Sequence, residues 1–164
     1  MREVPANKAV SRRFPERLFL LGSVDENGKR NVMTIGWCML TSVDPFEVAV
    51  SVCKDRHSHL LISRSREFTL AFPTGEMKEQ VLYCGSHSGR DVDKLTKSGL
   101  KWKPGEKVKS PLVDGCNANL ECKVIGEMDT GSHTIFVGEI VAAYIADRAQ
   151  KGLYCLDGRR YGSI

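Results

Sequence analysis

Long apolar runs are absent from the 164-residue sequence. No stretch approaches the roughly 18 to 20 apolar residues that a membrane-spanning helix requires. The first residues, MREVPANKAVSRRFPERL, include several basic side chains, but no apolar segment of the kind found in signal peptides follows them. Together these two absences predict a cytoplasmic protein that makes no contact with a membrane.

Closely spaced cysteine pairs are also missing. The nearest two cysteines, Cys116 and Cys122, are six residues apart, and no CxxC motif occurs. Zinc sites and thioredoxin-like redox motifs usually have tighter spacing. We therefore predict no metal site and six free thiols, most of them buried as small apolar side chains. These are Cys38, Cys53, Cys84, Cys116, Cys122 and Cys155.

The short motifs of several enzyme classes do not occur either. The sequence contains no HExxH, no P-loop, no GxGxxG before a helical segment and no Ser-His-Asp arrangement. Hydrolase, NTPase and Rossmann-type functions therefore lack support. The net charge is +4 with scattered lysines and arginines, so nucleic acid is not an expected partner. A modest positive field would suit a small anionic ligand.

The chain is long enough for one domain with a substantial core, and we expect a single domain over residues 1–164. Alternating apolar segments predict strands, and Asn27-Gly28 predicts a tight hairpin turn between the first two. Asp44-Pro45 and residues 129–132 predict two further turns. The predicted strands are 17–24, 31–41, 47–53, 68–72, 119–127 and 134–146.

Helical periodicity is confined to the middle of the chain. We expect helical segments at 58–66, 76–84 and 91–97, and an irregular loop at 99–115. Asp55 or Ser58 is the expected N-cap of the first helix, and Gly85 is the expected end of the second. The predicted fold is mainly β with inserted helices, most simply a closed barrel without free sheet edges.

The segment from Asn31 to Ser58 differs from an ordinary core strand pair because polar groups interrupt it repeatedly. The interrupting residues are Thr34, Trp37, Thr41, Ser42 and Ser51. A strand pair that only fills a core has no use for so many hydroxyls. A flat, phosphorylated ligand that forms hydrogen bonds would use them, with Trp37 either stacked on a planar ring or simply part of the core.

Donor groups gather at two places after these strands. Residues 54–58 (KDRHS) supply positive charge and hydroxyls where a strand passes into a helix, which suits phosphate but is also typical of a charged turn with an N-cap. Residues 86–94 (SHSGRDVDK) form a second donor cluster, or else a solvated surface loop. Cys84 beside it is a reactive or an inert thiol. His133 before the last strand is a general acid, a ligand contact or a strand-end polar residue.

Taken together, these segments resemble the flavin reductase-like family of FMN-binding split barrels, which includes flavoredoxin. The resemblance extends from about Arg17 to the end of the chain. The matching pieces are Asn31-Val32-Met33-Thr34 with Gly36-Trp37, residues 41–45 (TSVDP), Cys84-Gly85 with residues 88–94 (SGRDVDK), Pro111-Leu112 before residues 119–122 (NLEC), and residues 132–139 (SHTIFVGE).

The resemblance implies a six-stranded split barrel of Greek-key type that forms a homodimer, with an FMN near the subunit interface. His133 would be catalytic, Thr34 and Trp37 would contact the isoalloxazine, and the phosphate would bind Thr41, Ser42, Arg56, Ser58 and Lys94. The full set of implied cofactor-binding residues is Asn31, Thr34, Trp37, Cys38, Met39, Thr41, Ser42, Ser51, Val52, Arg56, His57, Ser58, Cys84, Ser88 and Lys94.

Three functions follow from the resemblance. The first is a flavin reductase that transfers a hydride from NADH or NADPH to FMN, with a redox protein or a flavin-dependent oxygenase as partner. The second is a flavoredoxin-type carrier that passes electrons between proteins without nicotinamide turnover. The third, chemistry like that of pyridoxamine-phosphate oxidase on a related barrel, has less support because the matching motifs belong to the reductase branch.

Overall fold

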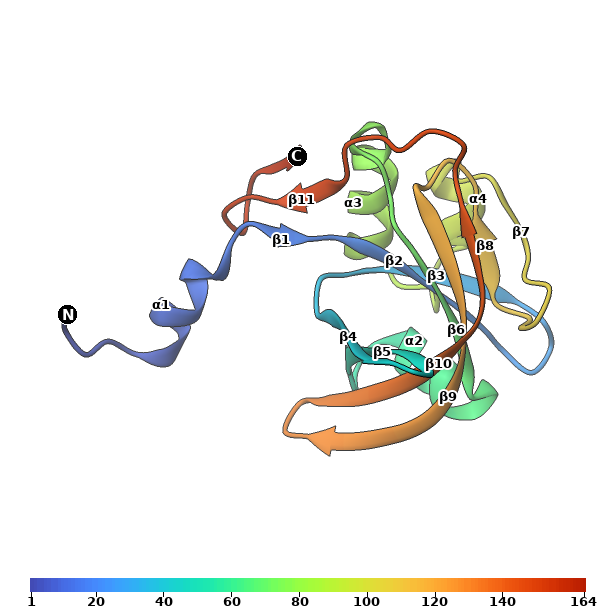
Figure 1. Cartoon of the computed structure of the whole chain (residues 1–164), viewed down its shortest axis with the longest axis horizontal. Helices are drawn as coiled ribbons and strands as arrows, with labels where there is room; N and C mark the ends of the chain where they lie inside the picture. The colour runs from blue at the N-terminus through green and yellow to red at the C-terminus, as the bar shows by residue number, and fades with distance from the viewer.

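The computed structural model describes residues 1–164, and its main element is a seven-stranded antiparallel sheet. The strand order is β3-β2-β6-β9-β10-β5-β4, so β3 and β4 form the two edges. Only two residues join β3 to β4, and the two edges therefore approach each other at this point (Figure 1). The strands are β2 (Phe19–Val24), β3 (Arg30–Ile35), β4 (Cys38–Val43), β5 (Phe46–Cys53), β6 (Glu67–Ala71), β9 (Ala118–Thr130) and β10 (His133–Ile145).

Helices and two small sheets surround the main sheet. The helices are α1 (Ala6–Val10), η1 (Ser11–Arg13), α2 (His57–Ser65), η2 (Gly75–Met77), α3 (Lys78–Ser86) and α4 (Lys94–Ser98). The small sheets contain β1 (Glu16–Arg17) with β11 (Leu153–Cys155) and β12 (Tyr161–Ser163), and β7 (Trp102–Pro104) with β8 (Pro111–Val113). The N-terminal arm with α1 projects away from the rest of the chain (Figure 1). None of the helices combines the length and apolar character needed to cross a bilayer.

Strand β2 separates two apolar clusters because its successive side chains point to opposite faces. Leu20 packs with Val81 of α3 and Leu95 of α4. Leu21 packs with Ile62 of α2 and with Phe136 of β10 in the second cluster. The two helical regions therefore cover different faces of the same strand, and β3 beside it is flanked by both. All six cysteines are free, as predicted, and four of them are buried.

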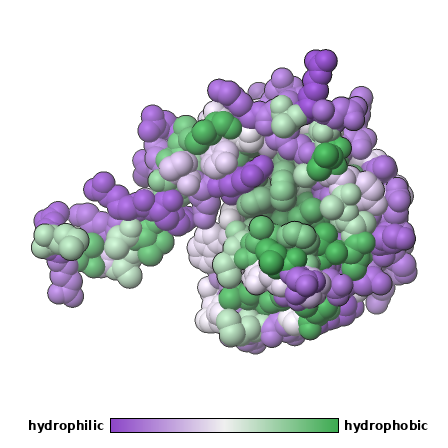
Figure 2. Space-filling view, in the orientation of Figure 1, coloured by the Kyte–Doolittle hydropathy of each residue, from purple (hydrophilic) through white to green (hydrophobic).

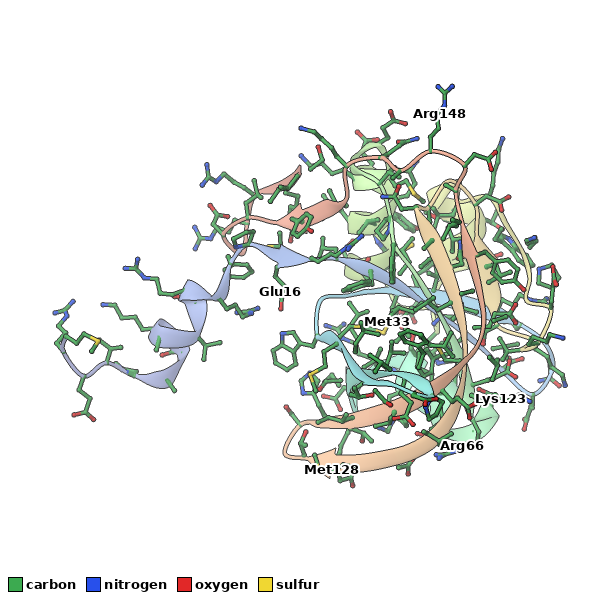
Figure 3. All side chains as sticks on the ribbon, viewed as in Figure 1. Glu16, Met33, Arg66, Lys123, Met128 and Arg148 are labelled. Carbon is green, nitrogen blue, oxygen red and sulfur yellow. The ribbon has the colours of Figure 1, made fainter.

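The prediction of one strand over residues 31–41 was wrong. The chain bends at Gly36-Trp37, where Cys38 N–H donates to the Gly36 carbonyl at 3.0 Å, and two strands result. This bend accounts for seven strands in the main sheet where six were expected. A Cβ at Gly36 would stand 2.8 Å from the side chain of Glu16. The Glu16 side chain extends from β1 toward this bend (Figure 3).

Several predicted boundaries also needed correction. Helix α2 begins after Arg56, and no side chain caps it, whereas Asp55 or Ser58 was expected to do so. Gly85 lies inside α3 and does not end it. The predicted loop at 99–115 contains the β7–β8 pair. The Asn27-Gly28 turn is confirmed, and Gly28 there adopts a φ of 81°.

A buried carboxylate organises the loop between β7 and β8. Glu121 of β9 is fully buried and accepts backbone N–H groups at 2.7–3.0 Å and the hydroxyl of Tyr144 at 2.7 Å. The three N–H donors are those of Glu106, Lys107 and Val108. Glu67 similarly accepts the N–H groups of Lys109 and Ser110. The loop is therefore held through its main chain.

Candidate functional site

A cleft of about 140 Å³ lies between β3, the turn that joins β5 to α2, and the loop that joins α3 to α4. The structure brings together here seven of the residues that the sequence predicted to bind a cofactor. They are Thr34, Arg56, His57, Ser58, Cys84, Ser88 and Lys94. Met33, which also lines the cleft, marks its β3 wall in Figure 3. Segments separated by 50 residues in the sequence thus form one site.

Two glycines allow the α3–α4 segment to approach β3 closely. A Cβ at Gly85 would be 3.2 Å from the Thr34 side chain, and a Cβ at Gly89 would overlap Oδ1 of Asn31. Thr34 donates its hydroxyl to the Val81 carbonyl of α3. The narrow spacing between β3 and this segment therefore depends on the absence of side chains at both glycines.

Three cations surround the cleft without carboxylate partners. Arg56, Arg90 and Lys94 take part in none of the four ion pairs of the structure. Lys94 is only 5% exposed, and its Nζ donates to the Cys84 carbonyl at 3.1 Å. Burial, together with the nearby Arg56, lowers the pKa of Lys94 to about 8. Asp55 also lines the cleft, so its lining carries three cations and one carboxylate, and an anion bound here would offset the excess positive charge.

The start of α2 adds further donors. Burial, and then the positive charges of Arg90, Lys29 and Lys94, lower the pKa of His57 below its ordinary value. Its Nδ1 is buried and has no hydrogen-bond partner. The first N–H groups of α2 lack a side-chain cap, and a helix N-terminus favours negative charge. An unsatisfied ring nitrogen, an uncapped helix and three cations without carboxylate partners fit the phosphate of a flavin nucleotide.

Asn31 lies behind the cleft wall. Its Nδ2 donates to Ser58 Oγ at 2.8 Å and to Ser23 Oγ at 3.2 Å, and the residue is 5% exposed. Its Oδ1 is buried and unpartnered, close to Gly89. Asn31 therefore holds Ser58, and it does not line the cleft itself.

A second group of predicted residues surrounds a mostly apolar cavity of about 220 Å³ on β4 and β5. It comprises Trp37, Cys38, Met39 and Ser51, joined by Ala49 and Ile135. The rings of Trp37 and His133 are 4.8 Å apart and inclined at 33°. His133 pairs with Cys53 at the end of β5. Arg56 of the 140 Å³ cleft, which we call the anionic-ligand cleft, follows Cys53 by three residues. The Trp37–His133 contact and the anionic-ligand cleft therefore lie near the same end of β5. The hydroxyl of Ser132 is 2.8 Å from His133 Nδ1.

Three predicted residues are not placed as the sequence suggested. Val52 is fully buried in the core, so its side chain cannot touch a ligand. Ser42 pairs with Glu47 at the start of β5, whereas Arg56 follows the opposite end of that strand. Six residues of strand correspond to about 20 Å. Within one chain, Thr41 and Ser42 therefore do not share a phosphate site with Arg56, Ser58 and Lys94.

Other cleft residues were absent from the predicted set. Gly85, His87, Gly89 and Arg90 line the cleft with the predicted residues. The donor-rich run 86–94 indicated a ligand loop, but it did not show which of its side chains face the cleft. Arg90 Nη1 donates to the Asp55 carbonyl at 2.9 Å, a contact across 35 positions that the sequence does not reveal.

Comparison with known proteins agrees with this arrangement. The family model for the flavin reductase like domain matches residues 11–164. A protein of Archaeoglobus fulgidus is 39% identical over 139 residues, which cover 85% of this chain and 77% of the relative. The ferric-chelate reductase (NAD(P)H) of the same organism is 28% identical over 128 residues, 77% of this chain and 74% of that protein.

Solved structures share the whole architecture. Flavoredoxin from Methanosarcina acetivorans superposes with a TM-score of 0.86 at 28% identity, covering 100% of this chain and 91% of that one. The FMN-binding protein from Thermus thermophilus with bound 1-cyclohex-2-enone gives a TM-score of 0.88 at 26% identity, covering 99% and 96%. Because the family match leaves out only the first ten residues, we conclude that the chain belongs to the flavin reductase-like family.

Proposed function

We propose that the protein binds FMN and is an NAD(P)H:flavin oxidoreductase. The observation that carries this proposal is the cleft at the start of α2, where Arg56, Arg90 and Lys94 have no carboxylate partner and His57 Nδ1 has no hydrogen-bond partner. A phosphate monoester satisfies this set of donors. The similarity to an FMN-binding protein and to a ferric-chelate reductase (NAD(P)H) supports the same cofactor and donor.

The residues of the cleft and of the neighbouring apolar cavity would have different roles in binding the flavin. The cleft holds the phosphate through Arg56, Lys94 and the Ser58 hydroxyl. Thr34 and Gly85 would border the part of the flavin between the cleft and Trp37, whose neighbours on β4 and β5 would supply an apolar surface for the flavin ring. When bound, the flavin supplies the capacity to accept a hydride. His133, in contact with Trp37, would orient the reacting groups and hold a proton near them.

The test is a visible spectrum of the purified protein before and after anaerobic addition of NADH or NADPH. We expect the two-band spectrum of an oxidised flavin, and its loss with at least one nicotinamide. Bands that persist with both donors would contradict the reductase assignment. A colourless protein that fails to take up added FMN would contradict flavin binding altogether.

A flavoredoxin-type electron carrier is the second candidate, supported by the similarity to a flavoredoxin over the whole chain. Retention of FMN through gel filtration, with rapid reduction by a ferredoxin and none by nicotinamide, would favour the carrier. Freely exchanging FMN with steady nicotinamide turnover would favour the reductase.

We further propose that the chain forms a split barrel that dimerises. Large apolar side chains on β4, β5 and β9 are exposed, and the space-filling view shows apolar residues gathered over part of this region (Figure 2). They include Trp37, Met39, Leu40, Val43, Phe46, Ile125 and Met128. Light scattering on the purified protein would show a mass of two chains, and a monomer would refute this point.

A flavin-dependent oxygenase would be a suitable acceptor of the reduced flavin.

A further inference from the structure

The cleft has two different ends, which are defined by how the α3–α4 segment passes along β3. Gly85 lies against Thr34, and Gly89 lies against Asn31, so the segment runs antiparallel to β3. Beyond Thr34 the strand continues to the bend at Trp37. At the other end, next to Asn31, the residue that follows Gly89 is Arg90.

The Thr34 end is open. Thr34 and Gly85 also line a neighbouring cavity of about 720 Å³, formed with the N-terminal arm and the β11–β12 hairpin. A ligand held in the cleft therefore has open space beside it at Thr34 and Gly85. Thr34 is also the cleft residue on β3 that is nearest in sequence to Trp37, beside which the flavin ring is proposed to lie.

At the Asn31 end, the exposed side chain of Arg90 bridges two segments that line the cleft. Arg90 Nη1 donates to the Asp55 carbonyl at 2.9 Å, and this bond joins the α3–α4 loop to the β5–α2 turn. These two segments form opposite walls of the cleft. The guanidinium thus lies across the cleft at the end away from the proposed ring position, with its remaining donors available to a ligand.

The size and charge of the cleft indicate what it encloses. Its 140 Å³ is well below the roughly 300–1,000 Å³ of pockets that enclose a whole drug-sized ligand, so it accommodates a head group. FMN ends in a phosphate monoester that carries up to two negative charges. FAD continues from the same phosphate through a second phosphate to adenosine, so its adenylate half would have to leave through the Asn31 end.

We propose that Arg90 is the residue that makes this cleft select FMN over FAD; the inference rests on the proposed flavin-binding function. The terminal phosphate of FMN fits with the Arg90–Asp55 bond intact and gains the guanidinium as a partner. FAD binding requires this bond to break and the guanidinium to move. Its inner phosphate also carries one charge fewer for the three cations to neutralise.

The test is to titrate FMN and FAD separately into the flavin-free protein and follow flavin fluorescence. We expect the wild-type protein to bind FMN at least about tenfold more tightly than FAD, and Arg90→Ala to bring the ratio close to one. Arg56→Ala is the matched control, because it removes a cation from the same cleft without touching the Arg90–Asp55 bond. It should weaken both flavins by similar factors and keep the preference.

Arg90→Lys provides a second variant, with equal charge but without the planar fork of donors. It should retain part of the FMN affinity and lose most of the preference. Equal affinities of the wild-type protein for the two flavins would overturn the inference, as would Arg90 variants that keep the full preference. Failure of the wild-type protein to bind either flavin would instead refute the proposed function, and with it this inference.

Discussion

Asn31 Nδ2 donates a hydrogen bond to Ser58 Oγ at 2.8 Å, although 27 positions separate the two residues in the chain. The bond links β3 to the first turn of α2. Because Ser58 accepts this bond, its own proton remains available for donation into the cleft. Asn31 thereby positions, from behind the cleft wall, the hydroxyl that we propose binds the phosphate.

Replacing either Asn31 or Ser58 should weaken FMN binding, because both changes remove the positioned Ser58 hydroxyl from the cleft. We expect Asn31→Ala and Ser58→Ala each to lower the affinity by about 0.5–1.5 kcal/mol, the net contribution of a typical hydrogen bond. The double variant should cost less than the sum, because Asn31 acts through Ser58. Fluorescence titration of the three variants measures the coupling. Strictly additive losses would show that Asn31 acts independently of Ser58.

Gly89→Ala should disturb the cleft without a change in charge. The added methyl group would overlap Asn31 Oδ1, so either the Asn31 side chain that holds Ser58 or the α3–α4 loop must shift. We expect FMN affinity to fall at least about tenfold, since donors 1 Å out of place bind poorly. Gly126→Ala in β9 is the control, because nothing lies within 4 Å of its added carbon. Similar titration curves for the two variants would contradict this account.

FMN binding should depend on pH through Lys94, whose pKa of about 8 is lowered by burial. The protonated amine attracts the phosphate dianion, which forms above about pH 6, so affinity should fall as the pH rises through about 8. Lys94→Ala should bind FMN more weakly by about 1–3 kcal/mol at neutral pH and should lack this alkaline decrease. An unchanged pH profile in the variant would assign the decrease to another group.

Glu121→Gln should destabilise the fold. Burial alone would raise the pKa of Glu121, but the bonds from Tyr144 and three backbone N–H groups lower it below its ordinary value. The carboxylate therefore contributes stability above its unfolded pKa of about 4.3, which is lost as the pH falls through the lower folded value. We expect the variant to lose about 2–4 kcal/mol at pH 7 in urea unfolding and to show a weaker acid dependence.

The exposed Glu106 offers a control for that measurement. Glu106→Gln removes a charge from the same loop but keeps the backbone N–H that Glu121 accepts. Its free energy of unfolding should stay within about 0.5 kcal/mol of the wild-type value. A comparable loss in both variants would point to the overall charge of the loop instead of the hydrogen bonds.

His133→Ala should separate catalysis from binding. His133 contacts Trp37 and lies outside the anionic-ligand cleft, so FMN affinity should change little. Flavin reduction by the nicotinamide donor should slow by about 10²–10⁴-fold if the imidazole holds a proton at the reacting groups. Stopped-flow absorbance under anaerobic conditions measures this rate. An unaltered rate would leave His133 with a packing role against Trp37.

Local sequence patterns predicted the strands and the two main helices because periodicity and turn residues act over short distances. Glu47 to Cys53 alternates, and Asn27-Gly28 allows a tight turn. The bend at Gly36-Trp37 was missed because the surrounding residues favour a strand without interruption. The Glu16 side chain, 20 positions away in the sequence, packs against this bend where the glycine leaves room, and local patterns do not reveal that contact.

The sequence predicted the kinds of side chain that line the cleft, but it did not predict which of the candidate residues lie there. Arg56, Ser58 and Lys94 belong to donor-rich segments, and the structure joins these segments across β3. Thr41 and Ser42 carry the same hydroxyl groups but lie at the opposite end of a strand. Only the register of β4 against β5 distinguishes the two cases, and register depends on tertiary pairing.

The loop between β7 and β8 is attached to the main sheet through Glu67 of β6 and Glu121 of β9. Both carboxylates accept hydrogen bonds from backbone N–H groups, which every residue except proline provides. The exposed side chains at positions 106, 107 and 109 can therefore diverge freely while the loop keeps its path, whereas Val108 is buried. In related chains, variation should concentrate at these surface positions and spare the two acidic anchors, so that the loop can acquire a new surface charge without refolding.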